Sequence, residues 1–307
     1  MISSQFKRFT YEELKDITGK FKEEIGRGYT GVVYRGILDD KGVVAVKQLT
    51  DVTQGEEEFW AEVSVIGRIN HINLVRMWGF CSERRHRLLV YEHLENQSLD
   101  KHLFENEKTL TWKERLKITL GIAKGLAYLH HECLEWIIHC DVKPENILLA
   151  RDFEPKIADF GLSKLTKRGG AGLNISQMRG TIGYMAPEWV LNLPITSKVD
   201  VYSYGVVLLE IVLGTRVSNL VLDYTEAGMP SFVSEVRSFL ECKDEPRIAD
   251  MVDPKLRGQY DSEQLITMIR VATSCLEEER NRRPTMDEVV RDLIALEESE
   301  DELSYSW

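Results

Sequence analysis

The sequence is poor in paired cysteines and in long apolar runs, and each shortage excludes a class of protein. Its five cysteines are scattered over 307 residues without the spacing of a disulfide framework or a zinc site, which favours a reducing compartment. The longest apolar runs, such as 206–209, fall far short of the roughly 20 residues that span a bilayer. We therefore expect no signal peptide or transmembrane helix here, and any membrane anchor should lie outside this segment.

Basic residues are also in the minority, with 39 Lys and Arg against 50 Asp and Glu and a formal net charge of −11. A negatively charged protein repels a polyanion, so nucleic acid is not expected as a partner. Hydrophobic residues make up 43% of the chain, which is enough to bury one large core or two modest cores. The composition therefore indicates a soluble globular protein.

The chain begins with a short helical pattern that gives way to strands. Thr10 and Glu13 have the spacing of a capping box, which predicts a short helix that ends near Gly19. We interpret this helix as a leader segment and not as a domain. Residues 21–46 then follow the pattern of two strands joined by a turn at 39–42.

The helical period returns at Glu56, and one stripe of this helix places Glu62 among apolar residues. A carboxylate buried there needs a cation as its partner. Residues 74–81 and 87–91 are predicted to be further strands, after which the chain becomes largely helical at Ser98. A small β-rich lobe should therefore precede a larger α-rich lobe.

The second half contains several predicted helices. Thr111 and Glu114 form a second capping box before a long amphipathic helix. Residues 197–213 are apolar on nearly every side, which predicts a helix buried all round and ended by Gly214. A last helix should start at a third capping box, and the acidic run at 297–302 should be solvated and mobile. The predicted parts are a leader at 1–18, a small lobe at 19–94, a large lobe at 95–297 and a tail at 298–307.

The most informative stretch is IHCDVKPEN at 138–146, followed by DFG at 159–161. Two carboxylates, a lysine and an asparagine in a loop between apolar segments are the groups that hold a metal-bound triphosphate beside a hydroxyl nucleophile. The order and spacing resemble the catalytic and magnesium loops of the eukaryotic protein kinases. That resemblance implies an α+β, bilobal fold with a small β-rich lobe and a larger α-helical lobe.

The resemblance assigns catalytic and metal-binding roles within these two loops. Asp141 would orient the substrate hydroxyl and accept its proton, and Lys143 would neutralise the transferring phosphoryl group. Asn146 and Asp159 would hold the metal ions, which should be Mg²⁺, with Mn²⁺ as a substitute. His139 is interpreted as a packing residue that sets the geometry of the loop.

A glycine-rich segment, GRGYTGVV at 26–33, supplies a candidate phosphate-binding loop through Gly26, Gly28 and Gly31. Dinucleotide-binding folds share this spacing, but there the motif opens a helix, whereas here a turn and a second strand are predicted. A glycine-rich hairpin without a ligand remains the alternative for this motif taken alone. The kinase interpretation predicts a flexible hairpin whose backbone closes over phosphates.

The remaining candidate residues would bind ATP. Lys47 could reach the α- and β-phosphates and pair with Glu62, although a surface lysine is the ordinary alternative. By the resemblance, Tyr91 is the gatekeeper beside a hinge formed by the backbone of 92–94. The residues predicted to contact the adenine from above, from below and at the hinge are Val33, Ala45, Leu148, Tyr91, Glu92 and Leu94.

Within the kinases, the chain resembles the cytoplasmic domains of plant receptor-like kinases of the Pelle-related group, closest to lectin-type members. The segments that carry this likeness are FTYEEL at 9–14, LVYE at 89–92, GTIGY at 180–184 and VDVYSYG at 199–205. The likeness implies a signalling domain in defence or development, on the cytoplasmic side of the plasma membrane. Lys143 and Thr181 fit Ser/Thr specificity, and a transient homodimer would allow autophosphorylation.

Three residues outside the cleft complete the prediction by resemblance. Asp200 should hold the catalytic loop by accepting its backbone N–H groups. Glu188 should form a buried ion pair with an arginine of the segment 282–283. Cys140 stands where most kinases have an arginine that binds a phosphate of the activation segment, so the chain resembles the non-RD kinases. We interpret Cys140 as a buried inert thiol, with a redox role as the alternative.

Two functions remain open on the sequence. The first is an active Ser/Thr protein kinase that uses ATP and Mg²⁺, because every group that the chemistry needs is present. The second is a nucleotide-binding signalling scaffold that transfers phosphate poorly, which the missing arginine and the unusual Tyr29 and Thr30 suggest. The candidate acceptors for autophosphorylation are Ser163, Thr166, Ser176 and Thr181.

Overall fold

The computed structural model describes residues 6–304, apart from 29, 40, 51–54, 68, 106–108, 167–172, 174–178 and 225–227. At 55, 222–224 and 297–304 only the backbone is described. Among these residues, no helix combines the length and the apolar character that crossing a membrane requires. Tyr29 and Ser176, two residues considered above, lie outside the described part of the chain.

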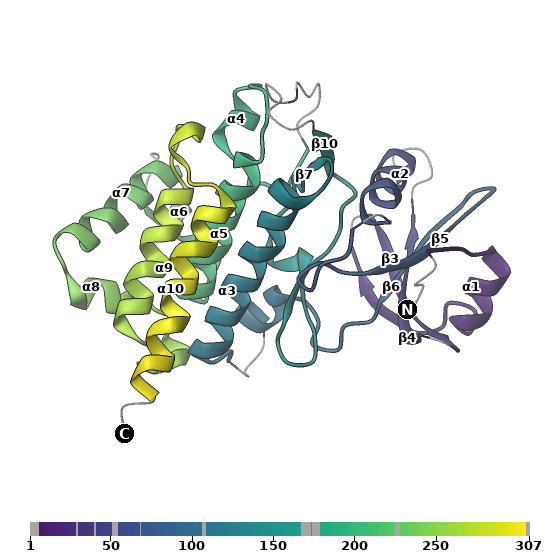
Figure 1. Ribbon diagram of the computed structural model, residues 1–307, viewed down its shortest axis with the longest axis horizontal. Helices are drawn as coiled ribbons and strands as arrows, with labels where there is room; N and C mark the ends of the chain where they lie inside the picture. The colour runs from purple at the N-terminus through teal and green to yellow at the C-terminus, as the bar shows by residue number, and fades with distance from the viewer. Residues whose placement is uncertain are drawn as a thin grey trace.

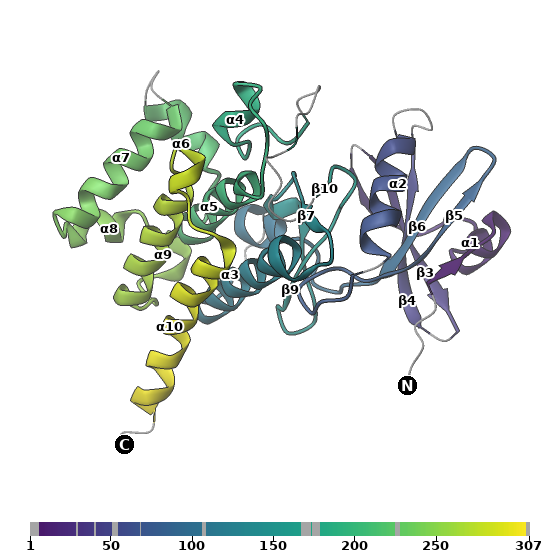
Figure 2. The ribbon, with the colours of Figure 1, turned by 45° about the horizontal axis from the view of Figure 1, so that its top comes forward.

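A six-stranded sheet forms the small lobe, with strand order β1-β5-β6-β4-β3-β2 (Figure 1). Helix α2 lies against this sheet on the side that faces the large lobe (Figure 2). The arrangement confirms the predicted small lobe, and its elements are β1 (Lys7–Arg8), α1 (Tyr11–Ile17), β2 (Glu24–Arg27), β3 (Gly31–Leu38), β4 (Gly42–Leu49), α2 (Gly55–Ile66), β5 (Met77–Glu83) and β6 (His86–Glu92).

The N-terminal leader is part of the small-lobe structure. Strand β1 pairs in parallel with β5, and a Cβ at Gly79 would lie 1.9 Å from the carbonyl oxygen of Lys7, so only glycine allows this approach. Thr10 and Glu13 make both hydrogen bonds of the predicted capping box on α1. Leu14 of this helix is fully buried in an apolar cluster that also contains Val44 and Val90. The leader therefore covers the outer face of the sheet.

The large lobe is mostly helical, as the sequence predicts (Figure 1). Short strand pairs, β7 with β10 and β8 with β9, lie where it meets the small lobe. Its strands and α-helices are α3 (Trp112–Ala127), β7 (Trp136–Ile138), β8 (Ile147–Leu149), β9 (Pro155–Ile157), β10 (Lys164–Thr166), α4 (Pro187–Val190), α5 (Lys198–Leu213), α6 (Val217–Tyr224), α7 (Gly228–Glu241), α8 (Glu245–Asp250), α9 (Ser262–Cys275) and α10 (Met286–Ser304). Single turns of π-helix (Lys101–Glu105 and Tyr128–Glu132) and of 3₁₀-helix (Pro144–Asn146, Pro254–Leu256 and Arg280–Arg282) connect them.

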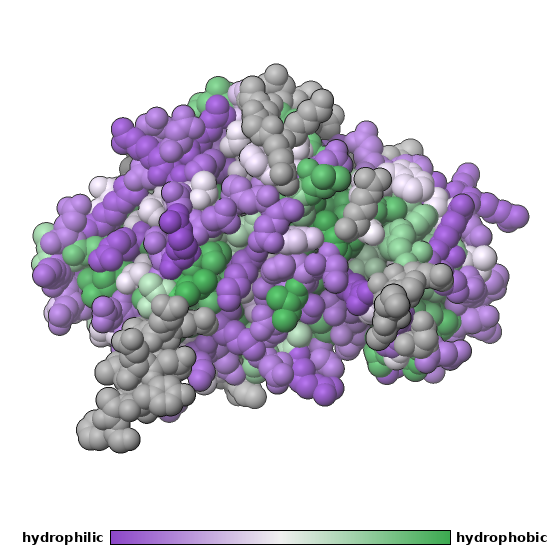
Figure 3. Space-filling view, viewed as in Figure 1, coloured by the Kyte–Doolittle hydropathy of each residue, from purple (hydrophilic) through white to green (hydrophobic). Residues whose placement is uncertain are grey.

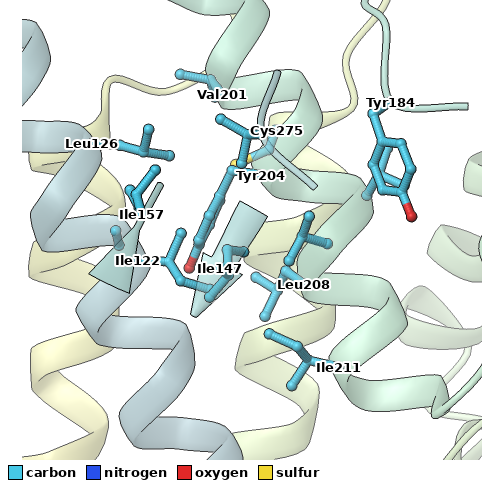
Figure 4. Close-up of a cluster of buried hydrophobic side chains, with 14 of the residues drawn as sticks. Ile122, Leu126, Ile147, Ile157, Tyr184, Val201, Tyr204, Leu208, Ile211 and Cys275 are labelled. Carbon is cyan, nitrogen blue, oxygen red and sulfur yellow. The ribbon is translucent and has the colours of Figure 1, made fainter. Parts of the chain in front are cut away.

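Helix α5 is the centre of the large lobe. All but the first of its residues are buried, and Gly214 ends it in the left-handed conformation, as predicted. Tyr204, Leu208 and Ile211 of α5 pack with side chains of α3, β8, β9 and α9 (Figure 4). The hydroxyl of Tyr204 donates to the carbonyl of Thr119, so its one polar atom is satisfied inside the core.

Two predicted boundaries are wrong. Strand β5 begins at Met77 and not at residue 74, because the backbone of Asn73 and Val75 pairs instead with Ile157 of β9 at 2.9 Å. This pairing connects the segment before β5 of the small lobe to β9 of the large lobe. The backbone of the acidic run at 297–302 is helical, since α10 continues to Ser304 through residues that are mostly good helix formers.

Candidate active site

The candidate residues gather where the two lobes meet. In the view of Figure 3, patches of apolar surface lie near the junction of the two lobes, beside surface that is mostly hydrophilic. The loop between β7 and β8 and the segment after β9 bring the polar candidates to this place. A long hairpin of the small lobe, formed by β3 and β4, supplies Lys47 from the other side.

Asp200 at the start of α5 anchors the loop after β7. Its two carboxylate oxygens accept hydrogen bonds from the backbone N–H groups of His139 and Cys140, each at 2.8 Å. The Nε2 of His130 lies 2.8 Å from the same carboxylate. The backbone of Cys140 has a φ of +68°, an uncommon conformation for a side-chain-bearing residue, which these charge-assisted bonds stabilise. The predicted contact of Asp200 is confirmed.

Asp141 lies at the centre of a polar group that joins the loop to the segment near Thr181. The hydroxyl of Thr181 donates to Oδ1 of Asp141 at 2.6 Å and accepts from Nζ of Lys143 at 2.7 Å. Lys143 also lies 2.9 Å from Oδ2 of Asp141, and Asn146 donates to the same oxygen at 2.9 Å. Both carboxylate oxygens are therefore held in place, and the predicted site residues Lys143 and Asn146 both contact Asp141.

Lys47 is shared by two carboxylates. Its Nζ lies 3.0 Å from Oδ1 of Asp159 and 3.7 Å from Oε2 of Glu62. Burial alone would lower the pKa of Lys47, but the two carboxylates outweigh burial and hold its pKa above the ordinary value. Glu62 is the partner that the sequence predicts, and the structure adds a shorter contact with Asp159. Lys47 stays protonated in this setting.

Glu62 has a second partner, Tyr91, that the sequence pattern did not predict. The hydroxyl of Tyr91 donates a short hydrogen bond to Oε1 of Glu62, and the backbone N–H of Phe160 points to the same oxygen at 3.3 Å. Burial and the neighbouring Glu62 raise the pKa of Tyr91 well above its ordinary value. The available signal was a tyrosine in an otherwise apolar strand, since a buried hydroxyl needs a partner.

The glycine-rich segment is the predicted hairpin, formed by β2 and β3. A Cβ at Gly31 would lie 2.2 Å from the carbonyl oxygen of Gln48, so the sheet itself requires this glycine. Among the described residues, none lies within 4 Å of a Cβ placed at Gly28, and at Gly26 only the Val33 side chain does. Packing thus explains the third glycine of the motif but leaves the first two free for another purpose.

The predicted adenine contacts lie on the cleft-facing side of the same sheet and beneath it. Val33 is paired in register with Lys47, and Ala45 with Tyr91, so all four share this region of the sheet. The side chains of Val33, Ala45, Leu94 and Leu148 are half-buried. The carboxylate of Glu92 accepts from the backbone N–H of Arg76 and pairs with Lys156, and these contacts hold the residue at which the predicted hinge begins.

The residues proposed for metal binding are oxygen donors suited to magnesium. Asp159 offers a carboxylate whose side chain is 30% exposed, and Asn146 offers an amide oxygen. Among the described residues no group of three or more His, Cys, Asp or Glu side chains forms a metal site. Magnesium usually binds one or two carboxylates together with waters and substrate phosphates, so this sparse donor set fits it.

The segment after the DFG motif is fixed by an ion pair at its end. Arg283 donates through Nη1 and Nη2 to both oxygens of Glu188, at 2.7 and 2.8 Å, which confirms the predicted buried pair. Ser163, named above as a candidate acceptor, is only 4% exposed and donates to the carbonyl of His139. Its burial argues against phosphorylation in this conformation, and that expectation is corrected.

Cys140 is buried, as predicted, and its surroundings favour an unreactive thiol. Burial, with the nearby Asp200, raises the pKa of its thiol well above the ordinary value. A thiol that stays protonated is a poor nucleophile. Its side chain also supplies no cation to the activation segment, so phosphate-dependent ordering has no partner at this position.

Comparison with known proteins places this geometry in a family. The protein kinase domain model matches residues 20–293. The putative receptor protein kinase ZmPK1 of Zea mays is 56% identical over 97% of this chain and 37% of its own length. The G-type lectin S-receptor-like serine/threonine-protein kinase At1g34300 of Arabidopsis thaliana is 47% identical over 95% of this chain and 35% of its own length. This chain thus spans about a third of each of these relatives, and it belongs to the protein kinase family.

Proposed function

We propose that this chain transfers the γ-phosphate of ATP to Ser and Thr hydroxyls of proteins, with Mg²⁺ as the metal and Mn²⁺ as a substitute. The observation that carries the proposal is the position of the Thr181 hydroxyl, which donates to Asp141 and accepts from Lys143. A substrate hydroxyl needs the same two contacts, one to take its proton and one to balance the charge of the incoming phosphoryl group. A short aliphatic hydroxyl fits these distances.

The roles of the cleft residues follow from their positions. Asp141 would accept the proton of the substrate hydroxyl, and Lys143 would stabilise the transferring group. Lys47 would hold the α- and β-phosphates while Glu62 and Tyr91 keep its side chain and helix α2 in place. Asp159 and Asn146 would bind the metal, which offsets the negative charge that develops on the phosphates.

The nucleotide would lie between the two lobes. Its adenine would contact Val33 and Ala45 from above and Leu148 from below, with the backbone of 92–94 as the hinge. Gly26 and Gly28 would let the hairpin backbone approach the phosphates, since neither position is filled by packing.

The relatives support a cellular setting for this activity. Both relatives are named as receptor kinases, and the one from Arabidopsis thaliana is named as a G-type lectin S-receptor-like serine/threonine-protein kinase. We therefore propose a signalling domain on the cytoplasmic side of the plasma membrane, attached through a membrane anchor outside this segment. A transient homodimer would bring the activation segment of one copy to the cleft of another.

The alternative is a nucleotide-binding scaffold that transfers phosphate poorly, and the lack of a cation at Cys140 is the observation that favours it. Incubation of the purified chain with labelled ATP, Mg²⁺ and a generic protein substrate separates the two. We expect sustained transfer, with phosphoserine and phosphothreonine in the products. Nucleotide binding without transfer would establish the scaffold, and predominant phosphotyrosine would reject the Ser/Thr specificity.

A further inference from the structure

Arg216, between α5 and α6, is held on the outer side of the catalytic loop by three different contacts. Its Nη2 lies 2.6 Å from Oε1 of Glu145, and its Nη1 donates to the hydroxyl of Tyr184 at 2.5 Å. Its guanidinium carbon lies 4.1 Å above the ring centre of Phe104. None of these contacts is needed by the chemistry assigned above to the cleft.

A second carboxylate belongs to the same group. Glu210 near the end of α5 is buried and accepts from the hydroxyl of Tyr184 at 2.8 Å and from the backbone N–H of Val217 at 3.1 Å. The Tyr184 hydroxyl points away from the apolar cluster of the large lobe (Figure 4). The hydroxyl of Tyr184 therefore links the buried Glu210 to Arg216.

This group borders the place where a substrate hydroxyl would reach Asp141. Glu145 lies in the 3₁₀ turn of the catalytic loop, between Lys143 and the proposed metal ligand Asn146. The backbone N–H of Tyr184 donates to the carbonyl of Thr181 at 3.1 Å, so Tyr184 belongs to the turn that carries the Thr181 hydroxyl. Arg216 bridges these two segments. A peptide whose hydroxyl reaches Asp141 must therefore run close to Arg216 and Glu145.

The Arg216 and Glu145 pair is open to this peptide. The side chain of Arg216 is 27% exposed and that of Glu145 is 40% exposed. A carboxylate at the edge of a peptide-binding surface would attract a basic substrate side chain. Here the charge is already balanced inside the chain, and a second cation would have to displace a guanidinium that has three partners.

We propose that Arg216 is a specificity-determining residue: it occupies the acidic subsite at Glu145, so that the kinase does not select substrates with Arg or Lys near the acceptor. The inference rests on the proposed function, because it concerns the protein substrate of the same cleft. Removing the guanidinium would leave the carboxylate of Glu145 unpaired beside the peptide and create a preference for basic residues. The guanidinium of Arg216 repels a basic substrate side chain and competes with it for Glu145. Such repulsive elements are a common way to set specificity.

A positional-scanning library of Ser/Thr peptides tests this role. R216M keeps a stem that can pack on Phe104 and removes the charge. R247M is the matched control, because Arg247 likewise contacts an aromatic ring, that of Phe239, and an acid, Asp244, at a site remote from the cleft. We expect wild type and R247M to show no selection for Arg or Lys, and R216M to gain about a three- to tenfold preference at one position. The double variant R216M/E145Q should lose most of that gain.

Several outcomes would overturn the proposal. An R216M profile equal to that of the wild type would mean that Arg216 only supports Tyr184. A wild type that already selects basic residues, and loses this selection in E145Q, would show that the acidic subsite is open. If thermal unfolding shows that R216M does not fold, R216Q is used, since its amide can keep the hydrogen bonds to Tyr184 and Glu145 without the charge, and the same profiles decide. A wild type that phosphorylates no peptide or protein contradicts the proposed function instead.

Discussion

Two buried ion pairs in this molecule are built in opposite ways. In the large lobe, Arg283 meets Glu188 with two parallel hydrogen bonds, and its remaining donors reach backbone carbonyls such as that of Glu277. In the cleft, Lys47 is divided between Asp159 at 3.0 Å and Glu62 at 3.7 Å. The first pair is saturated by the protein, whereas the second includes a partly exposed carboxylate. Because all donors and acceptors of the Arg283 and Glu188 pair are used within the protein, this pair has a structural role. The incomplete pairing around Lys47 leaves charged groups available for a ligand.

The largest expected effect separates these two pairs. Asp159→Asn should reduce phosphoryl transfer by more than about a hundredfold, because by the proposed role of Asp159 the phosphates would lose a metal that offsets developing charge. Its unfolding temperature should change little, since Asp159 is partly exposed and Lys47 keeps Glu62. The measurement is kcat at saturating Mg²⁺ together with thermal unfolding. Turnover equal to that of the wild type would contradict the metal-binding role.

Glu188→Gln should have the opposite effect, with a large loss of stability and little loss of phosphoryl transfer. Removing one partner of a buried pair leaves an uncompensated charge, which costs about 3–5 kcal/mol of unfolding free energy. The remaining folded fraction should still transfer phosphate, because Glu188 contacts no reacting group. Urea unfolding measures the loss, and the comparison fails if Glu188→Gln leaves stability intact and instead abolishes transfer.

The next prediction concerns cooperation within the cleft. Lys47→Ala and Glu62→Ala should each reduce activity by about a hundredfold, because each removes the support that positions the phosphates. The double variant should be little worse than either single variant, since the two side chains act through one contact. Initial rates for the four proteins complete the cycle. Losses that simply multiply would show that the two residues act independently.

Much of this cleft was predictable, because its chemistry is local in sequence. The catalytic loop holds Asp141, Lys143 and Asn146 within six residues. The starts of α1 and α3 are likewise predicted by capping boxes, whose two side chains are only three positions apart. Contacts between distant segments were harder to predict. The Tyr91 hydrogen bond to Glu62 joins residues 29 apart and the Arg216 pair with Glu145 joins residues 71 apart, and no periodic pattern encodes either contact.

Backbone pairing between distant strands was also missed for a physical reason. The parallel pairing of β1 with β5 depends on the missing side chain at Gly79, which is visible only once both strands are placed. In the same way, nothing local shows that Val75 would bond to Ile157 and not continue β5. Local propensity predicts which elements form, whereas partner choice depends on the packed structure.

Glu210 is another buried acid of the large lobe. Unlike Glu188, which pairs with an arginine, it has uncharged groups as its nearest partners. Burial raises its pKa from 4.5 to about 7, although hydrogen bonds from Tyr184 and Val217 act in the other direction. Between pH 4.5 and 7 the folded state keeps a proton that the unfolded state has released. Stability should therefore fall as pH rises through this range, by up to about 3 kcal/mol, and then level off.

The pH effect is measured by urea unfolding at pH 5 and pH 8. Glu210→Gln cannot lose a proton, so its stability should decline less than that of the wild type between these two values. Parallel declines in the two proteins would show that Glu210 does not titrate in this range.

The smallest expected effect follows from Cys140. Because this position carries no cation, a phosphate on the activation segment gains no charge-assisted partner there, and its ordering effect should be small. Phosphatase-treated enzyme should give nearly the untreated initial rate on an exogenous peptide. Loss of nearly all activity, recovered on rephosphorylation, would mean that another basic residue binds the phosphate. Arg179, which pairs with Glu57 of α2 at 3.4 Å, is the nearest candidate.

The central claim is that the hydrogen-bonded group around Asp141 performs phosphoryl transfer while the Lys47 side of the cleft holds the nucleotide. Single-turnover transfer and ATP affinity, measured in parallel for wild type and Asp141→Ala, test it most directly. We predict that the Kd for ATP changes little while the transfer rate falls by about a hundredfold or more, because the contact of Asp141 is made mainly in the transition state. A large rise in Kd with an unchanged transfer rate would contradict this account.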